Sequence, residues 1–187
     1  AVGGLEWNLP VSEHGYDWGT QWGYIPLQHS EELASITVFT PQDGRRLNAS
    51  ITISLRAGAA SFEVEPVLTN LVAADLDFHY WHNALLAPGP GNRPSAGLHI
   101  LLPGQAMTLH SSQDSRLPAP RQPFSWPLVD GRDLSRLGNW GPNLGFFERP
   151  AAHGPFAAVY DTIQDAGAVR VFPAQVARGS KVFGLGY

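Results

Sequence analysis

The most regular pattern of the chain alternates apolar and polar residues. Between Ala49 and Leu55, four apolar residues alternate with three hydroxyl residues, which predicts a strand with one buried face. Phe62–Glu65 repeats the alternation with glutamates in the polar positions, and Arg56–Ser61, which contains Gly58, has the length of a hairpin loop. Pro66 cannot donate a ladder hydrogen bond, so we place it at an edge, a bulge or the end of a strand.

A third strand is predicted over Leu76–Leu86, and its composition is unusual for a core strand. Its two faces carry Leu76, Phe78, Tyr80, His82 and Ala84 on one side and Asp77, His79, Trp81, Asn83 and Leu85 on the other. Polar groups in a dry core need partners, and aromatic rings beside hydrogen-bonding groups suit the face of a sugar. We therefore predict that this strand lines the functional site.

The rest of the chain is divided into short segments by glycine and proline. Further strands are predicted at Ser35–Thr40, Leu98–Leu102, Ala106–His110, Phe156–Asp161, Ala168–Pro173 and Lys181–Gly184. Turns are predicted at Pro41–Gly44, Pro103–Gly104 and Gln164–Gly167. The segment Ser125–Pro150 is predicted to be a long functional loop with a single helical turn over Asp133–Leu137. The chain is thus predicted to be all-β, an antiparallel β-sandwich in one domain over residues 1–187.

The composition excludes several classes of protein. A length of 187 residues fits one domain with a core, and 43% hydrophobic against 15% charged residues describes a globular chain. A net charge of −4 without a basic run argues against nucleic acid and anionic membranes as partners. There is no membrane-length apolar run, and we expect a soluble protein, cytoplasmic or exported. With no cysteine, disulfides and thiolate metal sites are excluded, and no metal or other cofactor is expected.

Five segments carry a resemblance that covers most of the chain. In order, they are GGLEWNLP, ITISLRAGAASFEVEPVLTN, WHNALL, WPLVDGRDLSRLGNW and FAAVYDTIQDAGAVRVFPAQVARGSKVFGLGY. Together they resemble an uncharacterised bacterial domain of the galactose mutarotase-like superfamily, of the kind often found beside tetratricopeptide repeats. The resemblance implies a β-supersandwich, whole or truncated, whose concave sheet face binds carbohydrate. Since the chain begins without methionine, we expect a processed end or a fragment of a larger supersandwich.

The same resemblance suggests catalytic residues, but it also shows departures. Sugar mutarotases use a histidine acid, followed four positions later by asparagine, as His79 and Asn83 are here. Their glutamate base lies downstream of the last strand matched in this chain. In similar domains a histidine follows the segment that ends here at Asp161, but this chain has Thr162 in that position. Similar domains also have a tryptophan near the final glycine, where this chain has Leu185. A catalytic apparatus inherited from mutarotases would therefore be incomplete.

The candidate catalytic residues are two histidines and two aspartates. His79 and His82 are candidates for a general acid because the ordinary pKa of histidine, roughly 6.5, lies near neutrality. On a regular strand they face opposite sides, which disfavours joint metal binding, and each has the alternative of a hydrogen-bonded sheet histidine. Asp133 and Asp161 are candidates for a base or for binding sugar hydroxyls, and Asp133 has the alternative of capping the turn that follows it.

The candidate binding residues are aromatic, acidic and basic. They are Trp81, Asn83, Trp126, Asp130, Trp140, Arg116, Glu6 and His14. Trp126 and Trp140 are candidate stacking platforms, with burial in a long loop as the alternative. Asp130 has the alternative of a turn with Gly131. Arg116 would read a uronate or sulfate through its two parallel N–H groups, with solvated surface as the alternative.

Three functions stay open on these grounds. The first is a carbohydrate-binding domain whose partner is a sugar or glycan. The second is an aldose 1-epimerase-like or other carbohydrate-active enzyme with a histidine acid and a carboxylate base. The third is a non-catalytic assembly module that forms a homodimer through its sheet face, because exposed sheet edges favour pairing with another chain.

Overall fold

The chain is described by a computed structural model that covers residues 4–9, 21–41, 47–85, 87–89, 91, 93–148, 154–177 and 179–186. It divides into two compact units, unit 1 (Ala1–Leu85) and unit 2 (Leu86–Tyr187). Every strand pair in the described ranges is antiparallel, and the helical content of these ranges is one 3₁₀ turn. The predicted all-β, antiparallel class is confirmed, and the single-domain organisation stays a prediction.

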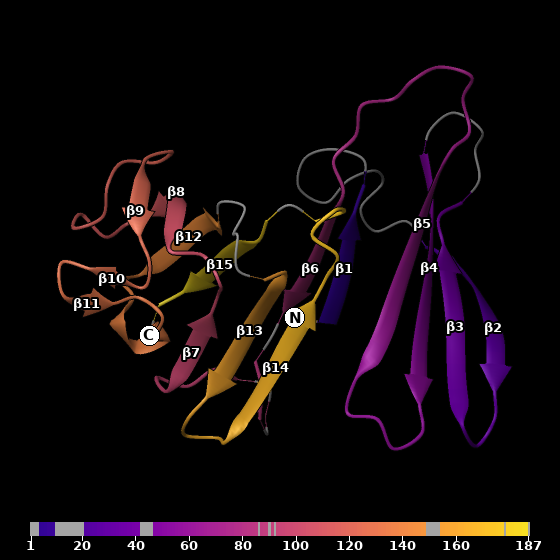
Figure 1. Ribbon diagram of the computed structural model, residues 1–187, viewed down its shortest axis with the longest axis horizontal. Helices are drawn as coiled ribbons and strands as arrows, with labels where there is room; N and C mark the ends of the chain where they lie inside the picture. The colour runs from indigo at the N-terminus through magenta and orange to yellow at the C-terminus, as the bar shows by residue number, and fades with distance from the viewer. Residues whose placement is uncertain are drawn as a thin grey trace. The chain divides into compact units, whose positions relative to one another are not determined.

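Unit 1 contains a four-stranded sheet and a two-stranded ribbon. The sheet has the order β2-β3-β4-β5, and these strands lie side by side in Figure 1. Their bounds are β2 Gly23–His29, β3 Leu33–Phe39, β4 Leu47–Arg56 and β5 Phe62–Asn70. The predicted β4–β5 hairpin is confirmed, and Pro66 lies in the edge strand β5, where a missing N–H is tolerated.

The ribbon pairs β1 (Gly4–Asn8) with β6 (Trp81–Leu85). Trp7 from β1 and Tyr80, just before β6, pack on the apolar face of the sheet. The buried residues of this unit 1 core are Leu9, Leu47, Ala49 and Ile51. The alternation in β4 therefore sends one side of the sheet to the core and leaves the hydroxyl side facing away from it.

The third strand begins later than predicted. It starts at Trp81 and not at Leu76, and residues 75–80 have no regular structure. The register explains the difference, because Trp81 is paired with Asn8, the last residue of β1. Because β1 ends at Asn8, it has no residue left to pair with the segment before Trp81. The alternation of Leu76–Tyr80 is thus not used in a sheet.

Unit 2 contains two sheets and a small hairpin. The strands are β7 Leu98–Leu101, β8 Ala106–Ser112, β9 Pro123–Ser125, β10 Leu128–Val129, β11 Arg132–Asp133, β12 Asn143–Glu148, β13 Phe156–Asp161, β14 Ala166–Val171 and β15 Lys181–Leu185. One sheet has the order β15-β12-β8-β9, the other β14-β13-β7, and β10 pairs with β11. The strands predicted from Leu98, Ala106, Phe156, Ala168 and Lys181 are confirmed within a few residues.

The segment predicted as one long loop is more ordered than expected. It contains β10, β11, the 3₁₀ turn η1 (Leu137–Asn139) and β12. β12 has a strand partner on each side, β8 and β15. The helical turn predicted over Asp133–Leu137 was wrong in position, since Asp133 ends β11. The loop prediction relied on glycine and proline content and overlooked the alternation Leu144, Phe146 and Glu148, which are all buried.

The two sheets of unit 2 share one hydrophobic core. It includes Leu98 and Ile100 from β7 and Met107 and Leu109 from β8. Phe146 of β12 has no exposed surface and lies among the rings of three other residues, Phe124, Trp126 and Trp140. This arrangement gives unit 2 a sandwich-like character.

Candidate functional site

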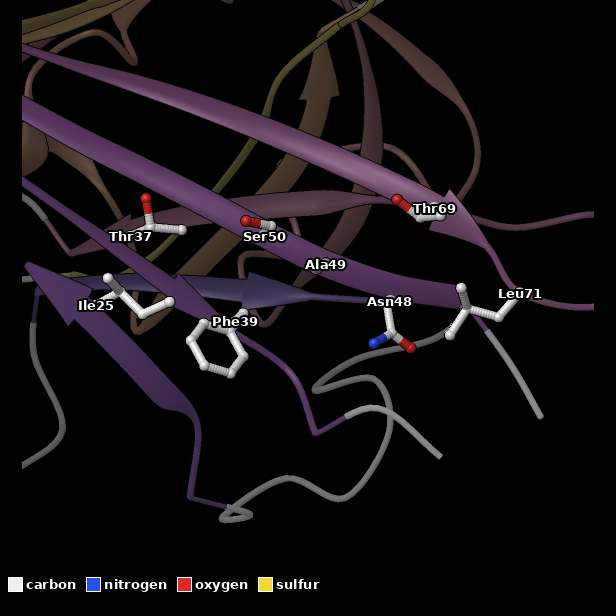
Figure 2. Close-up of a pocket in the computed structure, with 8 residues that line it drawn as sticks. All are labelled: Ile25, Thr37, Phe39, Asn48, Ala49, Ser50, Thr69 and Leu71. Carbon is white, nitrogen blue, oxygen red and sulfur yellow. The ribbon is translucent and has the colours of Figure 1, made fainter. Parts of the chain in front are cut away.

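The face of the four-stranded sheet that points away from the unit 1 core carries a groove. Its volume is about 310 Å³. It is lined by Ile25, Thr37, Phe39, Asn48, Ala49, Ser50, Thr69 and Leu71 (Figure 2). The register accounts for six of these eight residues, because Ile25 pairs with Thr37, Phe39 with Ser50, and Asn48 with Thr69 across neighbouring strands. Directly paired residues of antiparallel strands point to the same face, so four strands build one surface.

Several polar groups of this groove have hydrogen-bonding capacity to spare. The Oγ1 atoms of Thr37 and Thr52 are 2.9 Å apart and bond to each other. Asn48 is only 8% exposed, and its Oδ1 has no hydrogen-bond partner among the described residues. The hydroxyls of Ser50 and Thr69 also make no hydrogen bond with any of the described residues. The Ser50 and Thr69 hydroxyls are therefore the polar groups of the lining that are open to a ligand, whereas the occluded Asn48 Oδ1 is an unsatisfied acceptor that costs free energy.

An apolar wall lies beside these polar groups. The ring of Phe39 lies over Gly23, where an added Cβ would stand 2.5 Å from ring atoms Cε2 and Cζ. Gly23 thus leaves the room that the ring occupies. Ile25, 52% exposed, and Leu71, 38% exposed, add apolar surface to the lining. An aromatic ring next to hydroxyl and amide groups is the combination that binds the two kinds of surface of a sugar.

Among the described residues, none that lines the groove is charged, and the charged residues on the same sheet face lie beyond the lining. Glu65 pairs with Thr52 and Glu63 with Ser54, so both carboxylates share the face of the groove. Both side chains are exposed. Arg56, two positions after Ser54 on β4, lies on this face as well, so the described charges beside the groove are of both signs.

The ribbon of unit 1 brings several of the sequence-predicted residues together. Glu6 pairs with Asn83, whose Nδ2 donates to Glu6 Oε2 at 3.4 Å. Trp81 lies on the same ribbon face as these two residues because it is two positions from Asn83. His82 is on the other face, where its ring stacks on Trp7 at 5.1 Å with an interplanar angle of 8°. The ring of His82 is thus packed on Trp7, and its role as an acid or as a hydrogen-bonded sheet histidine stays a prediction.

His79 lies apart from this arrangement. It belongs to the irregular segment before β6, and its side chain is exposed. His14 lies outside the described residues. Of the eight residues that line the groove, none was singled out from the sequence.

Asp161 is a structural carboxylate in unit 2. It has no exposed surface and accepts hydrogen bonds from the Ser95 hydroxyl (2.7 Å) and from the N–H groups of Ser95 (3.1 Å), Ile163 (3.0 Å) and Gln164 (3.1 Å). Burial by itself raises the pKa of Asp161, but the hydrogen bonds from Ser95, Gln164 and Ile163 together lower it below its ordinary value. A buried, fully bonded carboxylate of lowered pKa is a poor base, so we correct the assignment of Asp161 to a catalytic role.

Asp133 and Asp130 both have structural roles in turns, which were the alternatives to sugar binding. Asp133 Oδ1 accepts from Ser135 N (2.9 Å) and Oγ (2.6 Å), which fixes the turn after β11. Asp130 and Gly131 connect β10 to β11 with φ angles of 49° and 77°. Two central residues of positive φ are what a type I′ hairpin turn requires, and Asp-Gly is a preferred pair for it.

Trp126 and Trp140 belong to the core of unit 2. Each is 6% exposed, and Trp140 Nε1 donates to the carbonyl oxygen of Leu134 at 2.7 Å. Neither ring presents a free face for a sugar, so the stacking interpretation is corrected to burial. The segment Ser125–Pro150 was predicted to be a functional loop because its strands had not been recognised.

Arg116 is engaged by an acidic neighbour that sequence reasoning missed. Its Nε and Nη2 donate to Oδ1 and Oδ2 of Asp114 at 2.9 and 3.1 Å, and Arg132 Nη1 donates to Oδ2 as well. The hydrogen bond from Arg116 holds the pKa of Asp114 well below its usual range, with Arg132 acting in the same direction. Since two of its N–H groups are occupied by Asp114, Arg116 is positioned to fix the turn after β8.

Glu148, at the end of β12, is a buried carboxyl whose ionisation affects stability. It is 6% exposed, and its Oε1 accepts from Gly104 N at 2.8 Å. Burial raises the pKa of Glu148, and hydrogen bonds from Gly104 and Ser180 offset this only in part. The folded state thus binds the proton more tightly than the unfolded state does, and stability falls as pH rises from the ordinary value of 4.5 through the raised pKa.

Glu148→Gln should therefore stabilise the protein at neutral pH, because glutamine keeps an acceptor for Gly104 without a buried charge. We expect a melting temperature a few degrees higher at pH 7 and no gain at a pH below 4.5. Thermal melts of both proteins across this range measure it. A gain of the same size at all pH values would contradict the argument from ionisation.

The described part of the chain has neither a metal-binding cluster nor a membrane-spanning helix. No cluster of three or more histidine, aspartate or glutamate side chains is arranged to hold a metal ion there. No helix there has the length and hydropathy to cross a membrane. Comparisons with protein families, with curated proteins and with solved structures find no match to this chain.

Proposed function

We propose that this protein is a carbohydrate-binding module that holds a sugar residue in the groove of the four-stranded sheet. The observation that supports the proposal is that the Phe39 ring lines the same groove as the polar side chains of Asn48, Ser50 and Thr69. Sugars present C–H faces to aromatic rings and hydroxyls to polar side chains, so each part of the groove has a counterpart in this ligand class.

The proposal agrees with what the sequence resemblance implies. A galactose mutarotase-like supersandwich, whole or truncated, binds carbohydrate on a sheet face, and we propose that this chain has such a fold. We propose binding without turnover, because the groove is lined by hydroxyl, amide and apolar side chains. General acid–base catalysis needs a titratable group within hydrogen-bond reach of the reacting atom.

The test is a binding screen of the full chain against neutral and acidic monosaccharides and short glycans, followed by NMR shifts. A sugar that binds should perturb the amides of β3 and β4. Ser50→Ala should weaken it by roughly 3- to 10-fold, which is the value of one hydrogen bond. Phe39→Ala should weaken it by about 10-fold or more through loss of the stacking surface.

Ser54→Ala is the matched control. Ser54 lies on the same strand and the same sheet face as Ser50 but does not line the groove. Its replacement should leave the affinity unchanged. If Ser50→Ala and Ser54→Ala bind equally well, or if the shifts map to unit 2, the groove is not the binding site.

A further inference from the structure

We propose that the protein forms a symmetric dimer in which strand β14 pairs with β14 of a second copy of the chain. β14 is an outer strand of the sheet β14-β13-β7, and no other strand of the described ranges pairs with its second side. The inference is independent of the proposed sugar binding. It follows from the direction of the backbone groups of β14, from the lack of a protecting device on this edge, and from the sequence of the strand.

The second side of β14 presents the N–H and C=O groups of every other residue. Phe172 N–H donates to the carbonyl oxygen of Pro155 at 3.0 Å, so the even-numbered residues of this strand bond toward β13. Hydrogen-bonded and non-hydrogen-bonded pairs alternate along an antiparallel ladder. Gly167, Val169 and Val171 therefore direct their backbone groups away from β13, to the open edge.

Other outer strands of the protein carry features that hinder pairing, whereas β14 does not. Proline removes an N–H donor, and a lysine or a covering segment keeps another strand away. β7 is covered, because Ile100 N–H donates to the carbonyl oxygen of Ser135 at 2.7 Å. The outer strands β2, β5, β9 and β15 contain Pro26, Pro66, Pro123 and Lys181, respectively. β14 contains neither proline nor lysine, and its residues Val169 and Val171 are 64% and 73% exposed.

The sequence of β14 fits pairing with itself about a two-fold axis at Val169. In that register Val169 lies opposite the same residue of the second copy, and Gly167 lies opposite Val171. Every outward-directed residue of both strands then belongs to a hydrogen-bonded pair. Arg170, the charged residue of the strand, falls opposite Ala168, so like charges do not face each other.

The neighbouring registers are less favourable. An axis at Arg170 would place two arginines opposite each other and would pair Gly167 with Pro173, which has no N–H to donate. An axis at Ala168 would leave Val171 beyond the first residue of the other β14. The register with Val169 on the axis is therefore the one we propose.

The first experiment measures the mass of the full chain by light scattering over a concentration series up to about 0.5 mM. The chain mass of 20.2 kDa should double without larger species, because the pairing uses the open edge of both copies. Val169→Lys should weaken the dimer by about 10-fold or more, since two like charges would meet at the axis. Val67→Lys, at a 54% exposed valine of the outer strand β5, is the matched control and should leave the dimer unchanged. Circular dichroism verifies the fold of each variant.

The second experiment tests the register with an introduced cysteine, since the native chain has none. Cα atoms of a hydrogen-bonded antiparallel pair are about 5.5 Å apart, which a disulfide can span. Val169→Cys should therefore become a covalent dimer in oxidised glutathione. Val171→Cys is the control on the same strand and face, because its two copies would lie about 14 Å apart along the paired strands. It should run as a monomer on a denaturing gel.

A dimer that Val169→Lys weakens and that Val169→Cys traps supports the proposal. A chain that is monomeric at all concentrations overturns it, as does a dimer that responds equally to Val169→Lys and Val67→Lys. Growth beyond a dimer contradicts the closed two-fold arrangement. Equal trapping of Val169→Cys and Val171→Cys contradicts the axis at Val169. None of these outcomes affects the proposed sugar binding.

Discussion

Phe146→Ala should unfold unit 2 at denaturant concentrations at which the native chain is still folded. Phe146 has no exposed surface, and its ring centroid lies 4.9 Å from that of Trp126, 5.7 Å from that of Phe124 and 6.3 Å from that of Trp140. Truncating a fully buried phenylalanine costs about 3–5 kcal/mol. The free energy of unfolding of a domain is about 5–15 kcal/mol, so this loss removes a large share of it.

Guanidinium unfolding, followed by circular dichroism and tryptophan fluorescence, measures the loss. The matched control is Phe147→Ala, which removes the neighbouring ring of the same strand. Phe147 is only half-buried and contacts His110 and Lys181 on the other face of the sheet. Its truncation should cost clearly less. Equal midpoints for the two variants would show that the aromatic cluster around Phe146 is not the centre of the core.

The cluster around Phe146 also explains why two tryptophans are not stacking platforms for a sugar. Trp126 and Trp140 are buried in the same cluster as Phe146, whose ring lies next to both of theirs. From the sequence, a tryptophan in a glycine- and proline-rich segment has two interpretations, because composition does not show which strands will cover it. The deciding strand is β12, and its partners β8 and β15 are separated from it in the chain by about 30 residues. Local sequence does not contain that information.

Three of the four strands of the unit 1 sheet could be predicted because their signal is local, whereas β2 was not predicted. The alternation over Ala49–Leu55 defines the faces of β4, and Gly58 marks the turn into β5. The third strand was misjudged because alternation alone does not supply a partner. Trp81–Leu85 became a strand where β1 pairs with it, whereas the equally alternating residues before Trp81 did not.

The groove escaped sequence reasoning for a related reason. Ser50 and Thr52 were correctly assigned to a polar face, and such faces usually just contact solvent. What turns part of this face into a groove is a set of contacts across strands, such as the Phe39 ring over Gly23 and the pairing of Asn48 with Thr69. The one available signal was Asn48, an amide in line with the hydroxyl residues of β4 that ends up buried.

Asp161→Asn should lower the melting temperature markedly, by roughly 5 °C or more. The carboxylate is the common acceptor for the hydroxyl and N–H of Ser95 and for the N–H groups of Ile163 and Gln164. It thus connects the segment before β7 to the turn between β13 and β14. An asparagine side chain has one acceptor oxygen, and its NH₂ group would face a donor, so at least one buried N–H loses its partner.

The pH dependence of this effect distinguishes a structural carboxylate from a catalytic one. Because the pKa of Asp161 is lowered in the folded state, its contribution to stability is present above the ordinary value of 3.8 and is lost as pH falls through the lowered pKa. The gap in melting temperature between the native chain and Asp161→Asn should therefore be full at pH 7 and shrink below pH 4. Asp165→Asn is the control from the same turn, where the exposed carboxylate accepts from the Tyr160 hydroxyl at 2.5 Å, and it should change stability little. If Asp161→Asn melted like the native chain but abolished sugar turnover in polarimetry, Asp161 would be a base after all, and unit 2 would have to be reconsidered as a catalytic unit.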